Sequence, residues 1–262
     1  IRRWIIENDW LEAIVALPLN MFYNTGIATY IWVLTNRKPT HRQGKVQLID
    51  ATQWFKPLRK NLGQKNCELS SDDIERVCRT FLDFKPTEES KIFPNAAFGY
   101  WKVTVERPLR LKGVDPHREY TPKDLRALRE SGEPSDEFPA VIRRIHKKGT
   151  AANPLRGLFE VSIGGKPTVV EYEPNPELRD TEQIPLLEEG RIEAFFRREV
   201  LPYAADAWYV PDSVRVGYEV SFTRHFYKPK PLRTLEEISA DILAVEKEAE
   251  GLLDGVLKSG AT

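Results

Sequence analysis

One segment constrains the fold of this chain more than any other: residues 17–34, LPLNMFYNTGIATYIWVL. The apolar run 12–17 stops at Pro18, and residues 27–34 are β-branched and aromatic, which predicts a second, buried strand. The loop between the two predicted strands contains Phe22, Tyr23 and Gly26. Because ligands of open α/β sheets bind beyond the ends of such strands, we expect a binding loop here.

The flanking segments extend this pattern. Residues 1–52 predict a helix and three strands, the last over 45–50. The connection 35–44 is polar and too short for a crossover helix, so we expect an antiparallel hairpin at the edge of the sheet. Further along, the patterns predict a helix over 70–84, a strand over 98–111, a short helix over 122–130, a hairpin over 158–172 and a helix over 188–201.

The C-terminal segment predicts a helix with a narrow apolar seam. Its apolar positions alternate by three and four residues, which is the heptad pattern of a coiled coil. Thr234 is a suitable N-terminal cap for it. The helix packs either on its own domain or against a partner subunit, and the narrow seam favours the partner. The predicted partner-binding residues are Ile238, Ile242, Val245, Ala249 and Leu252.

Composition excludes several classes of protein. Of the 262 residues, 41% are hydrophobic and 30% are charged, which is unlike a disordered or membrane protein. Cys67 and Cys78 lack metal-ligand spacing, so we expect reduced thiols and no metal site. The charge is unevenly spread: residues 1–65 hold ten basic and four acidic residues, whereas residues 180–262 hold ten and sixteen. This asymmetry suggests one end that faces nucleic acid and another that faces protein.

Several segments resemble the modification subunits of type I restriction–modification systems, which are N6-adenine DNA methyltransferases. The first are residues 10–18 (WLEAIVALP) and 22–34 (FYNTGIATYIWVL), and residues 104–111, 178–182, 192–202 and 222–227 follow in order. The resemblance implies an α/β fold. Residues 1–65 would form the C-terminal portion of a seven-stranded, Rossmann-like methyltransferase sheet, residues 66–230 an α+β region, and residues 231–262 a coiled-coil-like tail helix for subunit assembly.

Two motifs of that family are missing. There is no glycine-rich turn for S-adenosylmethionine, and Asn153-Pro154 and Asn175-Pro176 lack the rest of an Asn-Pro-Pro-aromatic motif. The chain also starts at Ile1, with its only methionine at Met21. We therefore expect part of a longer protein that holds no catalytic, cofactor-binding or metal-binding residue and does not methylate by itself.

The resemblance also implies the partners of the intact protein. It would use S-adenosylmethionine as its cofactor and act on DNA in the cytoplasm, without membrane contact. It would assemble with the specificity and restriction subunits of the same system. The alternative is a non-catalytic DNA-binding or assembly module that reuses this architecture.

Two groups of residues are candidates for contact with DNA. The resemblance implies that Phe22 or Tyr23 stacks on an adenine extruded from the duplex. In the alternative, Phe22 packs into the sheet and only Tyr23 lies near the surface. A basic cluster in the connection contacts phosphates or is an ordinary solvated loop. Its residues are Arg37, Lys38, Arg42 and Lys45, and the next cations are Lys56, Arg59, Lys60 and Lys65.

Overall fold

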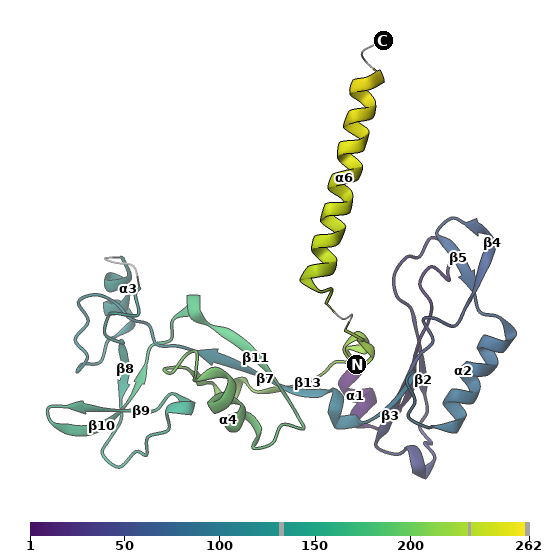
Figure 1. Ribbon diagram of the computed structural model, residues 1–262. Coiled ribbons are helices and arrows are strands. Elements are labelled where there is room, and N and C mark those ends of the chain that lie inside the picture. Colours follow the sequence, from purple (N-terminus) through teal and green to yellow (C-terminus); the bar gives the residue numbers. More distant parts are fainter. Residues whose placement is uncertain (131–133, 230–231, 260–262) are drawn as a thin grey trace. The chain divides into compact units, whose positions relative to one another are not determined.

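A computed structural model describes residues 1–130, 134–229 and 232–259 (Figure 1). The chain divides into two compact units, residues 1–222 and 223–262. The larger unit has several small sheets and few helices, which confirms the predicted mixed α/β class. Its elements are α1 (Arg2–Glu7), β1 (Leu11–Ala16), β2 (Tyr30–Leu34), β3 (Lys45–Asp50), β4 (Lys56–Leu62), β5 (Lys65–Glu68), α2 (Ser71–Asp83), β6 (Ser90–Pro94), β7 (Gly99–Glu106), α3 (Pro122–Glu130), β8 (Ile142–Ile145), β9 (Phe159–Ile163), β10 (Lys166–Tyr172), β11 (Asp180–Pro185), α4 (Arg191–Phe195), β12 (Trp208–Tyr209) and β13 (Arg215–Tyr218).

The first sheet positions the segment 17–34. It has four strands in the order β2-β1-β3-β6. β1 is parallel to β3 and antiparallel to β2, and β3 is antiparallel to β6. Every residue of β1 is buried. Val77 and Phe81 of α2 pack on the cluster that contains Val15 and Ile49, so this helix covers one face of the sheet.

Helix α2 confirms the helix predicted over 70–84. The side chain of Ser70 accepts a hydrogen bond from the backbone N–H of Asp73 at 3.2 Å, and the Asp73 carboxylate accepts one from the N–H of Ser70 at 2.9 Å. This capping box satisfies two backbone donors at the helix start. The hydroxyl of Ser70 also donates to the Asp73 carboxylate at 2.6 Å. This bond and the one from the Ser70 N–H hold the pKa of Asp73 below its usual value, because they favour the charged form.

Two predictions about this sheet are wrong. The connection 35–44 does not form a hairpin, because β2 and β3 lie on opposite sides of β1. The second strand starts at Tyr30 and is an exposed edge strand instead of a buried one, with Ile31 and Leu34 about half exposed. Among the strands that the structure describes, β2 pairs only with β1. An apolar strand composition shows that a strand can be covered, but not whether the covering element belongs to the same chain.

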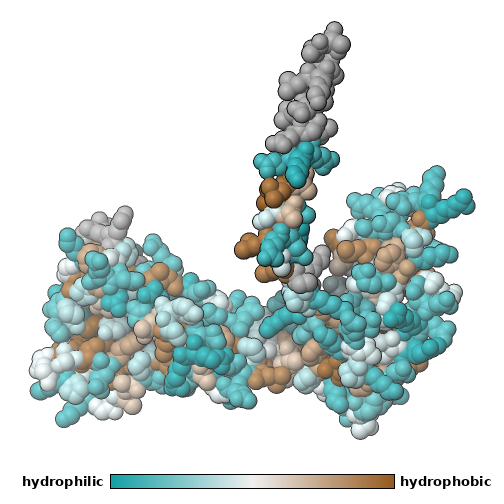
Figure 2. Space-filling view, in the orientation of Figure 1, coloured by the Kyte–Doolittle hydropathy of each residue, from teal (hydrophilic) through white to brown (hydrophobic). Residues whose placement is uncertain are grey.

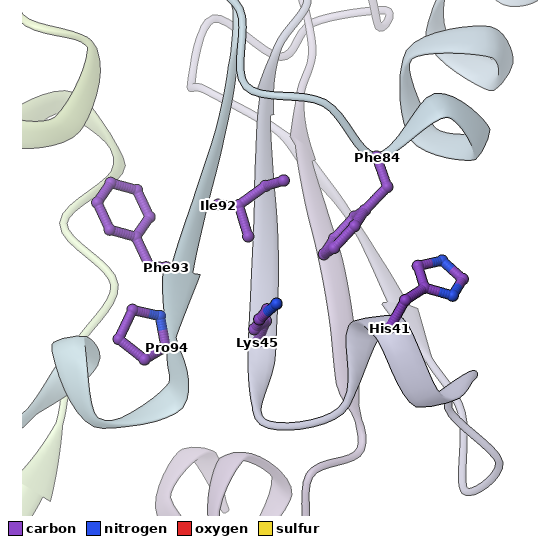
Figure 3. Close-up of a pocket in the computed structure, with 6 residues that line it drawn as sticks. All are labelled: His41, Lys45, Phe84, Ile92, Phe93 and Pro94. Carbon is purple, nitrogen blue, oxygen red and sulfur yellow. The ribbon is translucent and has the colours of Figure 1, made fainter.

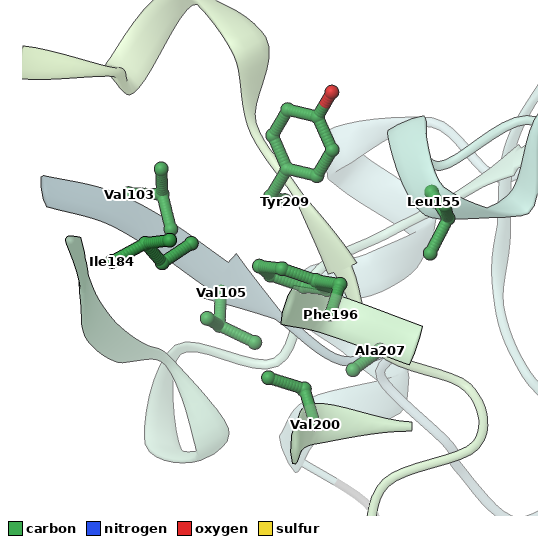
Figure 4. Packing of buried hydrophobic residues seen from close by; sticks show 8 residues of the cluster. All are labelled: Val103, Val105, Leu155, Ile184, Phe196, Val200, Ala207 and Tyr209. Atoms are coloured by element: carbon green, nitrogen blue, oxygen red, sulfur yellow. The ribbon is translucent and has the colours of Figure 1, made fainter. Parts of the chain in front are cut away.

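A second core lies in residues 99–222 (Figure 4). Strand β7 pairs with β11, β12 and β13. Phe196, which lies in a π-helical turn directly after α4, is fully buried in this core. Its ring centroid is 5.3 Å from that of Tyr209. Strands β9 and β10 form the predicted hairpin, and the two turn glycines, Gly164 and Gly165, both have positive φ.

The smaller unit contains the tail helix, α6 (Leu235–Ser259), which confirms the predicted helix. Thr234 caps it: its hydroxyl accepts from the N–H of Glu237 at 3.2 Å. Of the predicted seam, Ile238, Ile242, Val245 and Ala249 are exposed, and hydrophobic side chains are visible on this helix in Figure 2. The side chain of Leu252 lies outside the described residues, so its place in the seam stays a prediction.

Candidate nucleic-acid interface

Residues 18–29, which we name the aromatic loop, join β1 to β2. The Leu17 N–H donates to the Thr29 carbonyl at 3.0 Å and closes the base of the loop. At its tip the chain reverses over residues 22–25, where Thr25 N–H donates to the Phe22 carbonyl at 3.4 Å. Asn24 has φ of 52°, a left-handed conformation that asparagine tolerates better than most residues. The tip is therefore a turn at the carboxyl end of β1.

The turn exposes both aromatic side chains. Phe22 is 46% exposed and Tyr23 is 67% exposed. The alternative in which Phe22 packs into the sheet is therefore wrong. Both rings present apolar faces that can stack on an unpaired base, and a flipped nucleotide needs such a surface. Their stacking role stays a prediction, and the exposures do not select one ring over the other.

Lys38 lies inside the protein and not on an exposed basic loop. Its ammonium is 2.5 Å from a carboxylate oxygen of Asp9 and donates to the carbonyl of Lys45 at 2.7 Å. Asp9 also accepts from the N–H of Gly44 at 2.9 Å. Burial by itself would raise the pKa of Asp9, but these hydrogen bonds hold it below its usual value. Lys38 thus holds the connection 35–44 in place. The prediction that Lys38 is an exposed cation that contacts DNA is corrected.

Arg42 is buried too, with 3% of its surface exposed. Its guanidinium carbon lies 4.2 Å from the ring centroid of Phe81 and 4.3 Å from that of Phe84. A nitrogen of the same group is 3.4 Å from the Glu12 carboxylate. The guanidinium also donates to the backbone carbonyl of Phe81. The donors of the guanidinium are occupied inside the protein, so Arg42 is not available to phosphates. It holds the connection 35–44 where this segment crosses the amino end of β1.

Arg37 and Lys45 remain exposed, as predicted. Lys45 borders an open cavity of about 420 Å³, with His41 and Phe84 on one side and Phe93 and Pro94 on the other (Figure 3). The ring centroids of His41 and Phe84 are 5.6 Å apart. The cavity combines apolar walls with two basic groups. DNA contact by Arg37 and Lys45 stays a prediction.

The structure does not bring the two predicted groups together. β1 is antiparallel to β2 and parallel to β3, so the aromatic loop follows the carboxyl end of β1 whereas the connection 35–44 crosses its amino end. The two segments are close in sequence but lie at opposite ends of β1, because the chain passes along β2 between them. The signal for this separation was the acidic pair Asp9 and Glu12, which can neutralise cations that approach the amino end of β1.

Three further features concern metal ligands, membrane-spanning helices and the cysteines of the described residues. Among them, no group of three histidine, cysteine, aspartate or glutamate residues is placed to hold a metal ion. No helix in the described ranges is long and apolar enough to cross a membrane. Cys67 is buried and Cys78 is exposed, and both thiols are free.

The sheet with the aromatic loop lies in the part of the chain, residues 1–100, that matches the N-6 DNA Methylase family. The methylase subunit of the type I restriction enzyme MjaIX from Methanocaldococcus jannaschii is 34% identical over 89 residues, which are 34% of this chain and 15% of the relative. The MjaVII methylase subunit from the same organism is 28% identical over 142 residues, 50% of this chain and 24% of the relative. The HindI methylase subunit from Haemophilus influenzae is 38% identical over 80 residues, 30% of this chain and 17% of the relative.

These matches confirm the predicted resemblance to the modification subunits of type I restriction–modification systems. The chain spans between 15% and 24% of the length of these relatives. A solved structure with partial similarity is the type I restriction-modification system methyltransferase subunit from Streptococcus thermophilus. It has 20% sequence identity and a TM-score of 0.32, and the match covers 37% of this chain and 19% of that one.

Proposed function

We propose that this chain is a portion of an adenine-specific DNA methyltransferase subunit in a type I restriction–modification complex. In the complete protein, a methyl group would pass from S-adenosylmethionine to N6 of an adenine in DNA. The observation that carries the proposal is the exposed pair Phe22 and Tyr23, at the carboxyl end of β1 and inside the region that matches the methylase family. The role proposed for this chain is to hold the extruded base.

We propose that the described residues of this chain do not form a site for S-adenosylmethionine. Helix α2 follows β5 directly, but its N-terminus is closed by Ser70 and the carboxylate of Asp73 instead of a glycine-rich turn. The sequence also lacks the Asn-Pro-Pro-aromatic motif that would hold the adenine amino group. The chain alone is therefore proposed to be inactive, and the rest of the methyltransferase sheet, including the remainder of its seven strands, would lie in other parts of the complete protein.

The first prediction concerns the aromatic loop. In the complete protein, Tyr23→Ala or Phe22→Ala is expected to lower kcat/KM for methylation roughly 10- to 100-fold, because stacking on one base contributes about 1–3 kcal/mol. The measurement is transfer of labelled methyl groups to duplex DNA, with the product nucleoside identified by mass spectrometry.

Leu19→Ala is the matched control, since Leu19 is exposed in the same loop but is not aromatic. Full activity in both aromatic variants would exclude base stacking by this loop. A methylated base other than N6-methyladenine would overturn the proposed specificity.

The second prediction concerns the tail helix, which we propose binds a partner subunit through a coiled-coil-like seam. Ile242→Asp with Val245→Asp would place two charges in that seam, so binding to the specificity subunit should weaken at least 100-fold. The melting temperature of the free chain should stay unchanged, because both side chains are exposed in it. Calorimetric binding and thermal melting measure the two effects.

Glu246→Ala with Glu248→Ala provides the control on the other faces of the same helix and should bind normally. If the seam variant binds normally as well, or if its melting transition collapses, the seam does not belong to a partner interface. The restriction subunit is the other proposed partner, and the same variants test whether it uses this helix.

A further inference from the structure

The carboxyl end of the first sheet carries a second element beside the aromatic loop. β1 and β3 are parallel, so the chain leaves β3 at the same end of the sheet at which it leaves β1. The segment after β3 leads into β4 and β5, which pair with each other as a separate two-stranded ribbon (Figure 1). The ribbon β4–β5 is thus placed where ligands of α/β sheets bind.

Direct contacts join the ribbon to the aromatic loop. The N–H of Asn66 donates to the carbonyl of Asn20 at 3.1 Å. The buried thiol of Cys67 donates to the carbonyl of Leu19 at 3.2 Å. These bonds hold β5 against the first half of the loop, so the ribbon and the loop form one surface.

The tip of the ribbon touches the tip of the loop. Gly63 has φ of 59°, and a Cβ atom at this position would lie 2.5 Å from the side-chain oxygen of Asn24 and 3.1 Å from the ring of Tyr23. Both distances are shorter than ordinary van der Waals contact, so a larger residue would require the side chains of Asn24 and Tyr23 to shift. The glycine therefore lets the more exposed aromatic ring lie against the ribbon.

The ribbon is also strongly basic. Residues 56–65 contain four cations and no acidic residue. Lys56, Arg59 and Lys60 are exposed. Within the described residues none of these three has an ion-pair partner, in contrast to Lys38 and Arg42, whose charges are used internally. Exposed cations without internal partners are available to an external anion.

We propose that the ribbon β4–β5 binds the nucleic-acid backbone beside the base that the aromatic loop holds. A phosphate contact requires only charge and reach, and a two-stranded ribbon fits the major groove of DNA. The ribbon then holds the DNA strand, while Gly63 allows Tyr23 to lie close to the ribbon. This inference rests on the proposed function, because it takes the nucleic acid to be the substrate of the same site.

The experiment measures binding of the 262-residue chain to a fluorescein-labelled DNA duplex of about 20 base pairs that carries one unpaired 2-aminopurine, at several salt concentrations. Arg59→Ala with Lys60→Ala should weaken binding about tenfold at low salt. It should also reduce the slope of log affinity against log salt by about 1.5, since each lost phosphate contact removes about 0.7–0.9.

Two double variants with the same change in net charge are the comparators. Lys123→Ala with Arg126→Ala removes two exposed cations from α3 and should bind normally. Arg37→Ala with Lys45→Ala removes the cations at the opposite end of β1 and should have a smaller effect than the ribbon variant. Equal loss in all three pairs, or no binding by the unmodified chain at about 0.1 mM, would overturn the proposal.

Two glycine-to-alanine variants distinguish the effect of the close approach at the ribbon tip from the effect of backbone strain. Gly63→Ala should reduce the change in 2-aminopurine fluorescence on binding while leaving the salt slope intact. Gly164→Ala, in the turn of the β9–β10 hairpin, carries a similar strain at φ of 58° but meets nothing within 4 Å, so its fluorescence change should be normal. Equal behaviour of the two variants would remove Gly63 from the site.

The outcome is distinguishable from that of the proposed function. If the ribbon variant binds DNA normally while the complete protein still methylates adenine, only the ribbon assignment fails. If the ribbon effects are found but the complete protein does not methylate adenine, the enzyme assignment fails and the binding surface remains.

Discussion

Replacing Arg42 with alanine should lower the free energy of unfolding by about 3–5 kcal/mol, because it leaves the carboxylate of Glu12 buried without its ionic partner. The variant also loses the stacking of the guanidinium on Phe81 and Phe84. Urea unfolding followed by circular dichroism measures the change. The control is Arg37→Ala in the same connection, which removes an exposed cation and should change the free energy by less than about 0.5 kcal/mol.

A double variant identifies the cause of that loss. In Arg42→Met with Glu12→Gln the uncompensated charge is gone, so a substantial part of the lost stability should return. If the double variant is as unstable as Arg42→Ala, packing and not charge explains the effect. If Arg42→Ala itself costs less than about 1 kcal/mol, the buried ion pair does not stabilise the crossing of β1.

Phe196→Ala should destabilise the second core by about 3–5 kcal/mol, since it removes a fully buried ring and leaves a cavity. The neighbours that line this cavity are Val103, Ile184 and Tyr209, which come from three different strands (Figure 4). The surroundings therefore cannot close the cavity by moving one element alone. Thermal melting and hydrogen exchange on β7 and β11 report the loss.

Tyr203→Ala is the control for aromatic content, because Tyr203 is 89% exposed seven residues further along the chain. Its effect should be within about 0.5 kcal/mol. If Phe196→Ala melts like the control, the cluster around Phe196 is not the core that holds β7 and β11 together.

Local patterns in the sequence were sufficient for most elements of the fold. The capped helix α2, the hairpin at Gly164 and Gly165, and the tail helix after Thr234 each depend on short-range chemistry. Strand order could not be predicted in the same way. The polar connection 35–44 has the composition of a hairpin turn. The ion pairs of its Lys38 and Arg42 with Asp9 and Glu12 hold it across the amino end of β1 instead. Those bonds join residues about 30 positions apart in sequence, which periodicity does not detect.

The same distinction between local sequence and contacts of distant residues applies to the candidate site. The position after a strand predicts a binding loop, the family resemblance implies that Phe22 or Tyr23 stacks on a base, and the structure exposes both side chains. Lys38 and Arg42 were predicted as exposed cations because sequence alone does not show whether a charge has a buried partner. The contact of Gly63 with Asn24 and Tyr23 was missed for a similar reason: it forms only when two loops meet at one end of a sheet. The signal for the ribbon was present in the two-residue turn Gly63-Gln64 between polar strands.

Among the described strands, only β1 pairs with β2, so one side of β2 is open and the order of the aromatic loop depends on what lies beyond that side. A strand with one hydrogen-bonded neighbour opens at a lower free-energy cost than a strand between two. The aromatic loop ends where β2 begins, so local opening of β2 also releases the attachment of the loop at Thr29. A chain segment that adds a strand to this edge would slow such opening. The added strand would thereby reduce the motion of the loop that carries Phe22 and Tyr23 without touching either ring. The affinity of the loop for a base would then depend on whether a further strand completes the sheet.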